Sequence, residues 1–116
     1  MGKPVVHWEI RARNAPELQK FYGDLFDWKI DTNNPMDYGL VETGGTGGIN
    51  GGIGGSPSPE AAGLSFYVQV PDLQAALDKA ESLGGKTLMG PTEIPNVVTL
   101  AMFADPEGNC IGLLKG

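Results

Sequence analysis

A succession of patterns that occurs twice constrains the fold of this chain more than any other feature. Residues 4–11 (PVVHWEIR) and residues 64–70 (LSFYVQV) both alternate apolar and polar side chains. That period of two is typical of a strand with one buried face. Each alternating stretch is followed by apolar residues at helical spacing. These residues are Leu18, Phe21, Tyr22 and Leu25 in the first copy, and Leu73, Ala76, Leu77, Ala80 and Leu83 in the second.

The sequence also indicates where both helices begin and where the second helix ends. Asn14 is a candidate N-cap, with Glu17 three residues later in the capping-box position. Asp72 is the equivalent N-cap before the second helix, and Gly84-Gly85 is a C-cap after it. The sequence therefore predicts two helices, each entered from a strand.

Shorter strands complete both copies. We expect them over 27–31, 38–43 and 49–53 in the first copy, and over 86–89, 97–104 and 110–114 in the second. The chain is thus predicted to be α+β, with two βαβββ modules over about 3–55 and 63–116 and a Ser-Pro linker over 56–62. Each copy alone is too small for a comfortable core. We therefore expect one domain, 1–116, whose curved mixed sheet surrounds a cavity.

Composition excludes several classes of function. The net charge is −6 with only eight Lys and Arg, which argues against nucleic-acid binding and against docking on an anionic membrane. No apolar run approaches the roughly 20 residues of a membrane span. Cys110 is the single cysteine, so neither an intrachain disulfide nor a cysteine metal cage is possible. These observations favour a soluble, cytoplasmic protein.

The polar faces of the two alternating strands hold the candidate site residues. His7, Glu9 and Arg11 share one face of the first strand, and the second strand offers a matching set of Ser65, Tyr67 and Gln69. Polar groups on a sheet face opposite the helices are what a ligand cavity needs. The same alternation also fits the solvated face of an ordinary antiparallel sheet.

Three roles are open to His7, the only histidine: metal ligand, general base, or hydrogen-bonded structural residue. Glu9 lies two residues on and points to the same side, so this pair is the best acid–base constellation in the sequence. The glycines of 44–55 contain no G-x-G-x-x-G motif between strand and helix, which argues against a dinucleotide site. Those glycines do leave room for something to approach a strand closely.

Several stretches resemble the glyoxalase/bleomycin-resistance/extradiol-dioxygenase superfamily, also called the vicinal oxygen chelate superfamily. They are the opening HWEI, the Phe21-Tyr22 pair, the helix exit LFDW, and DPEGNCIGL near the end. GGINGGI resembles the branch described as related to lactoylglutathione lyase. The resemblance covers the whole chain and implies the fold predicted above.

The resemblance also implies positions for a divalent metal. His7 falls on the first ligand position, whereas the second falls on Ser65 and the closing glutamate falls on Gly112. The remaining position lies near 48–52, where only Asn50 has a side-chain oxygen. Because Ser65 is a poor ligand and Gly112 has no side chain, we expect no cofactor, with a metal at His7 as the alternative.

Three functions follow as hypotheses. The first is a metal-independent binding protein, homodimeric like the drug-binding members of the superfamily, that holds a small molecule. The second is a lyase, isomerase, epimerase-like or dioxygenase-type enzyme, metal-dependent or with Glu9 or His7 as its base. The third is a protein–protein interaction module. For the first, the residues expected around the ligand are His7, Glu9, Asn50, Ser65, Tyr67, Gln69 and Phe103, with Trp8 and Trp28 as further aromatic candidates.

Overall fold

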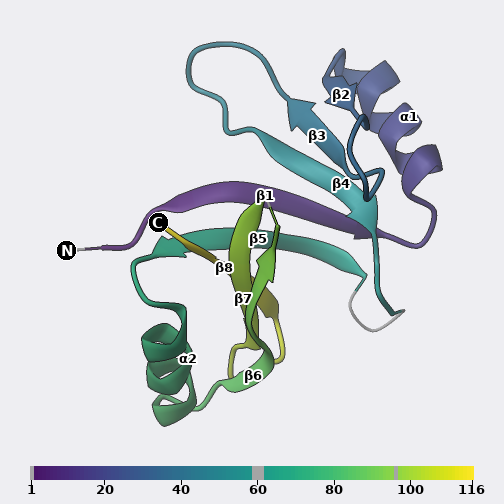
Figure 1. The fold of residues 1–116 in the computed structure, drawn as a ribbon. Helices are drawn as coiled ribbons and strands as arrows, with labels where there is room; N and C mark the ends of the chain where they lie inside the picture. Colours follow the sequence, from purple (N-terminus) through teal and green to yellow (C-terminus); the bar gives the residue numbers. More distant parts are fainter. Residues whose placement is uncertain (1, 59–61, 96) are drawn as a thin grey trace. The chain divides into compact units, whose positions relative to one another are not determined.

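The computed structural model describes residues 2–58, 62–95 and 97–116, and divides them into two compact units (Figure 1). Module one is residues 7–64, and module two is residues 1–6 together with residues 65–116. The residues before His7 belong to module two. One contact that joins them to it is the backbone N–H of Gln69, which donates to the carbonyl of Pro4 at 2.9 Å. Of the predicted linker, residues 59–61 lie outside the described residues.

Module one takes all but the first two residues of β1 (Val5–Ala12). β1 leads through α1 (Ala15–Phe26) into β2 (Lys29–Asp31), β3 (Gly39–Glu42) and β4 (Gly51–Gly55). The strand order is β2-β3-β4-β1. β1 and β4 are parallel, and the other neighbours are antiparallel. The Asn14 side chain accepts from the Glu17 N–H at 3.2 Å, so the predicted N-cap is confirmed.

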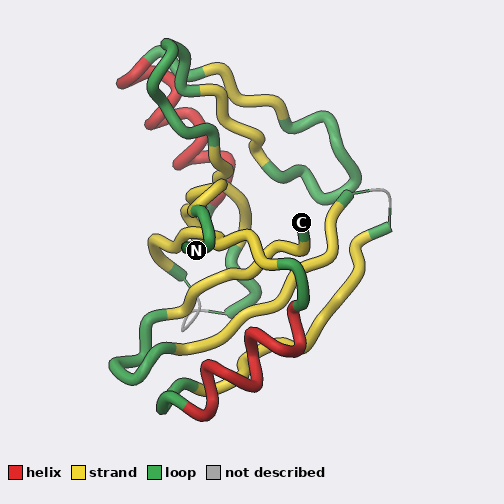
Figure 2. Tube along the Cα trace, turned by 90° about the vertical axis from the view of Figure 1, so that its left-hand side faces the viewer, coloured by secondary structure: helices red, strands yellow, loops and turns green. Residues whose placement is uncertain are grey.

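Module two repeats this topology with β5 (Gly63–Val70), α2 (Leu73–Ser82), β6 (Lys86–Ile94), β7 (Val98–Ala104) and β8 (Cys110–Lys115). The order is β5-β8-β7-β6, again with the first and last strands parallel. The Asp72 side chain accepts from the Ala75 N–H at 3.0 Å, as its N-cap position predicts. In Figure 2 each helix lies against one face of the strands of its own module. The α+β class with two βαβββ modules is confirmed.

Three strands, β2, β4 and β6, differ from their predicted bounds by two residues or more, and the others differ by one residue at one or both ends. Asp27 is the left-handed C-cap of α1, with φ 57°, so β2 begins only at Lys29. β4 begins at Gly51 because the Asn50 side chain accepts from the Thr43 N–H at 3.1 Å and closes the preceding loop. β6 runs on to Ile94, and its register shifts accommodate a proline, which has no N–H for the ladder.

The two predicted helical stripes are not buried equally. α2 buries Leu73 and Leu77 in a cluster with Val70, Ala101 and Leu113. The expectation of a buried stripe on α1 is wrong for two of its members, since Phe21 is 54% exposed and Leu25 is 56% exposed. The physical reason is that β2 is only three residues long and β4 is mostly glycine, so these strands offer little apolar surface to α1.

Among the described residues, no helix has both the length and the apolar character needed to cross a membrane.

Candidate functional site

Four polar side chains of module one form a hydrogen-bonded cluster. β1 presents His7, Glu9 and Arg11 on one face, as their alternation predicts. Arg11 Nη1 donates to Glu9 Oε1 at 2.8 Å, and the hydroxyl of Tyr38 donates to Glu9 Oε2 at 2.8 Å. The same hydroxyl lies 3.0 Å from His7 Nε2. His7 and Glu9 are thus joined through a residue that the sequence analysis did not single out.

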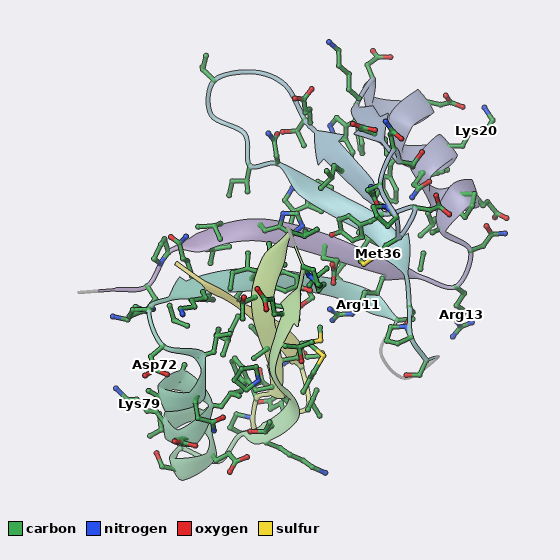
Figure 3. The ribbon with its side chains drawn as sticks, in the orientation of Figure 1. Arg11, Arg13, Lys20, Met36, Asp72 and Lys79 are labelled. Atoms are coloured by element: carbon green, nitrogen blue, oxygen red, sulfur yellow. The ribbon has the colours of Figure 1, made fainter. Side chains whose placement is uncertain are left out.

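Burial divides this cluster into a support and an accessible part. Glu9 and Arg11 are 7% and 6% exposed, whereas His7 and Tyr38 are half-buried. Figure 3 labels Arg11 near the end of β1 that leads to α1. Two opposite charges are therefore buried as a directly bonded pair, and His7 and Tyr38 are the more exposed members of the cluster.

Tyr38 comes from the loop between β2 and β3 and lies over the glycine strand. Gly52 and Gly54 pair in register with Glu9 and Arg11, so their missing side chains would stand on the same face as the cluster. A Cβ at residue 52 would overlap the Tyr38 hydroxyl, and one at residue 54 would lie 2.5 Å from the ring. The expected close approach to this strand is therefore made by the chain's own tyrosine.

Electrostatics favours the neutral form of the histidine. Burial lowers the pKa of His7 below 6.5, because the charged imidazolium loses solvation, and the nearby Glu9 carboxylate opposes this shift. Glu9 is in turn held by a cation and a hydroxyl. At neutral pH the cluster therefore consists of a neutral imidazole beside a Glu9–Arg11 ion pair.

The opposite face of module one is aromatic. The ring centroid of Trp28 lies 5.4 Å from that of Trp8, 5.9 Å from that of Tyr22 and 5.0 Å from that of Phe26. A Cβ at Gly51 would overlap the Trp8 ring, so a glycine is needed here too. Trp8 and Trp28 belong to this helix-side cluster and do not join the polar site.

The predicted ligand residues of β5 are mostly engaged within module two. Ser65 is buried, and its hydroxyl donates to the carbonyl of Cys110 at 2.7 Å. Tyr67 is buried with its ring in the space that a side chain at Gly112 would fill. The half-buried Gln69 side chain lies beside Gly116.

Phe103 and Asn50 lie elsewhere. Phe103 packs against the buried cluster under α2 and lines an apolar cavity of about 560 Å³ between α2 and its sheet. Val68 also lines this cavity, whereas Tyr67 points to the other face of β5, so the structure does not bring Phe103 beside Tyr67. The cavity offers apolar surface. Of its charged residues, Lys3, Asp72 and Lys79 are exposed and Asp105 is half-buried. Asn50 is exposed and bonded to the backbone of Thr43.

The residues at the implied metal positions do not fit a divalent ion. Ser65 Oγ donates to a carbonyl, the Asn50 oxygen accepts from an N–H, and the room at Gly112 is filled by the Tyr67 ring. Within the ranges that the structure describes, no three His, Cys, Asp or Glu side chains gather as a donor set.

Sequence reasoning found three members of the cluster and missed Tyr38. The spacing of Gly52 and Gly54 at alternate positions did signal that one face of β4 must admit a bulky group. It did not say which group, because the approach is made from a loop that is distant in the sequence.

Fold and site together define an α+β protein of two βαβββ modules, one of which carries a buried polar cluster on its first strand. The sequence model of the Glyoxalase/Bleomycin resistance protein/Dioxygenase superfamily matches residues 5–113. The chain belongs to this superfamily.

Individual relatives agree with this membership. The chain is 30% identical over 108 residues to a "Glyoxylase-like domain-containing protein" of Didymella fabae, covering 87% of this chain and 84% of that protein. It is 26% identical over 113 residues to CFP32 of Mycobacterium bovis, covering 90% of this chain but only 42% of that relative. A superfamily member from Vibrio splendidus 12B01 has the same fold, with a TM-score of 0.66 and 14% identity over 99% of this chain and 100% of that one.

Proposed function

We propose that this protein binds a small molecule through the polar cluster of module one, without a metal. The observation that carries the proposal is the buried Glu9–Arg11 pair beneath the half-buried His7 and Tyr38. A buried ion pair adds little to stability compared with well-packed apolar residues, so its presence favours a role in recognition. His7 and Tyr38 supply the groups that orient a ligand, and Glu9 and Arg11 hold them in place.

A ligand screen by thermal unfolding tests this proposal. Benzoate, phenol and bleomycin serve as probes of increasing size, each against wild type, His7→Gln and Lys20→Ala, whose lysine forms an exposed ion pair on α1. A probe at 100 times its Kd should stabilise the wild type by about 2.7 kcal/mol. We expect this shift in wild type and Lys20→Ala and its loss in His7→Gln. If His7→Gln shows the same stabilisation by a probe, that probe binds at a site other than the polar cluster.

Metal content is the second test. Protein purified without chelators should hold no stoichiometric metal, and titration with Ni²⁺, Zn²⁺ and Mn²⁺ should leave its unfolding temperature unchanged. Stoichiometric metal that is lost in His7→Ala would overturn metal independence.

An acid–base enzyme is the second candidate function, favoured by the order of contacts in the cluster. His7 is oriented by Tyr38, which is bonded to Glu9, and a base oriented by a further group is typical of acid–base sites. The geometry favours His7 over Glu9 as the base, because both Glu9 oxygens already accept hydrogen bonds. A bell-shaped rate profile that His7→Gln abolishes would support this candidate.

Homodimer formation belongs to the binding-protein proposal, and a protein–protein interaction module is a third candidate function. The exposed side chains Phe21, Leu25 and Phe26 on α1 give an apolar surface that such contacts would cover. Light scattering of wild type and Phe21→Ser, at equal concentration, measures whether the chain self-associates through this surface.

A further inference from the structure

The protons of the module-one cluster can be assigned by counting donors. An ionised Glu9 only accepts hydrogen bonds, and Arg11 only donates them. Tyr38 has a single hydroxyl proton, which it donates to Glu9 Oε2 at 2.8 Å. The 3.0 Å contact between Tyr38 and His7 Nε2 therefore needs its proton from the imidazole.

We infer that Tyr38 is the positioning residue of this site and holds neutral His7 as the Nε2–H tautomer, so that Nδ1 carries the lone pair. Nε2–H then donates to the Tyr38 oxygen, whose own proton points to Glu9. The tautomer is thereby set from outside β1, by a residue 31 positions later in the chain.

The loop that carries Tyr38 is built to hold it in this position. Asn34 Oδ1 accepts from the Tyr38 N–H at 2.9 Å, and Asn34 Nδ2 donates to the Tyr38 carbonyl at 2.6 Å. Asp37 precedes it in the left-handed region, with φ 51°. The backbone of Tyr38 is thus fixed on both sides by one side chain.

The floor beneath the ring is equally specific. Gly52 and Gly54 leave room for the ring on the face of Glu9 and Arg11, and a Cβ at residue 52 would collide with the hydroxyl itself. Gly55, in the same strand, has open space where its Cβ would be. Glycine at position 52 is therefore a requirement of the Tyr38 hydroxyl and not of the strand in general.

The tautomer limits what the site can recognise, a consequence that rests on the proposed function. A neutral imidazole with its proton on Nε2 accepts hydrogen bonds only at Nδ1. Any group that bonds to Nδ1, whether it comes from the protein or from a ligand, must therefore be a hydrogen-bond donor. The tautomer itself is a property of the protein without ligand and is tested separately.

A chain with one histidine makes the test direct, because all imidazole nitrogen signals belong to His7. Long-range ¹H–¹⁵N spectra of ¹⁵N-labelled protein near pH 8 should show a protonated Nε2, an unprotonated Nδ1 and a protected Nε2–H proton. In Tyr38→Phe we expect the protected proton to be lost and the two nitrogen shifts to converge as the tautomers mix.

Two controls separate this role from general packing. Tyr22→Phe removes a tyrosine hydroxyl from the aromatic side of the same module and should leave the His7 signals unchanged. Gly52→Ala keeps the Tyr38 hydroxyl but displaces it, and should reproduce the Tyr38→Phe spectrum, whereas Gly55→Ala should not.

The inference is overturned if the wild type shows Nδ1–H, an observation that needs no variant to fold. It is also overturned if a folded Tyr38→Phe keeps the wild-type His7 spectrum. Because no ligand is added, these outcomes are independent of the ligand screen. A confirmed tautomer with no probe bound would count against the proposed function alone.

Discussion

Modules one and two share a topology but differ in what they bury. In module two, α2 places Leu73 and Leu77 into an aliphatic cluster with the sheet. In module one, α1 has no fully buried residue, and the buried side chains of β1 include Glu9 and Arg11. Module one also buries the apolar side chains of Val41 and Ile53, so the two copies differ in that module one adds a polar network to its apolar residues.

The difference between the modules bears on where a functional site is expected. Positions that break the rules of a stable core are expected at functional sites. Module one breaks them three times, with a buried ion pair, a glycine strand and an exposed helix stripe. Module two buries the polar Ser65, whose hydroxyl bonds to a carbonyl, but its described residues hold no buried ion pair. The comparison therefore favours the first copy for the candidate site.

Truncating one leucine in each helix should give the largest contrast. Leu77 is 1% exposed, so Leu77→Ala should cost about 2–5 kcal/mol of unfolding free energy through a cavity in the core. Leu25→Ala, on the exposed stripe of α1, should change it by less than about 0.5 kcal/mol. Urea unfolding followed by circular dichroism measures both. Equal costs would show that the two helices are buried alike.

Alanine substitutions at two glycines test a packing feature that the modules share, a tyrosine ring seated on a glycine. Gly52→Ala collides with Tyr38 and Gly112→Ala collides with Tyr67, so each should cost about 1–3 kcal/mol. Gly55→Ala and Gly90→Ala meet open space and serve as the matched controls, with changes within about 0.5 kcal/mol. If Gly112→Ala leaves the unfolding free energy unchanged, the requirement for glycine beneath a tyrosine holds only in module one.

Removing the N-caps should affect the two helices similarly, because each cap satisfies one backbone N–H of its first turn. Asn14→Ala and Asp72→Ala should each cost about 1 kcal/mol, read from the urea midpoint. Asp24→Ala removes an exposed ion pair with Lys20 and should cost no more than about 0.5 kcal/mol. A cap effect in only one module would show that the other helix is held by packing.

The pH dependence of stability should carry a small contribution from His7. Its pKa is lowered by burial in the folded state, so the unfolded state binds more protons just below pH 6.5. The contribution is complete above that pH and is lost as the pH falls toward the lowered pKa. On acidification the wild type should therefore lose more unfolding free energy than His7→Gln, which has no imidazole to protonate. A smaller loss in the wild type would mean that the attraction of Glu9 outweighs burial.

Local signals in the sequence identified much of this architecture. Alternation placed His7, Glu9 and Arg11 on one face, because that relation depends only on the period of a strand. Asn14 and Asp72 marked the starts of the helices, because a cap bonds to a backbone group three residues away. Such features need no knowledge of distant residues.

Predictions that depended on distant partners were less complete. Tyr38 was missed because its contacts with His7 and Glu9 span 31 and 29 positions. Ser65 was expected to line a cavity, and its donation to Cys110, 45 residues away, was not foreseen. The exposure of Leu25 followed from the short and glycine-rich strands beside α1, which the helical stripe alone does not reveal.

The sequence by itself determined that two βαβββ copies exist and that the polar face of β1 carries His7, Glu9 and Arg11. Periodicity and capping are local, and the amino-acid order encodes them directly. Only the tertiary structure decided that Tyr38 joins this face and that Phe103 lies under α2, apart from Tyr67. Those placements depend on which strands pair and on the room that Gly52 and Gly112 leave, which no stretch of sequence specifies alone.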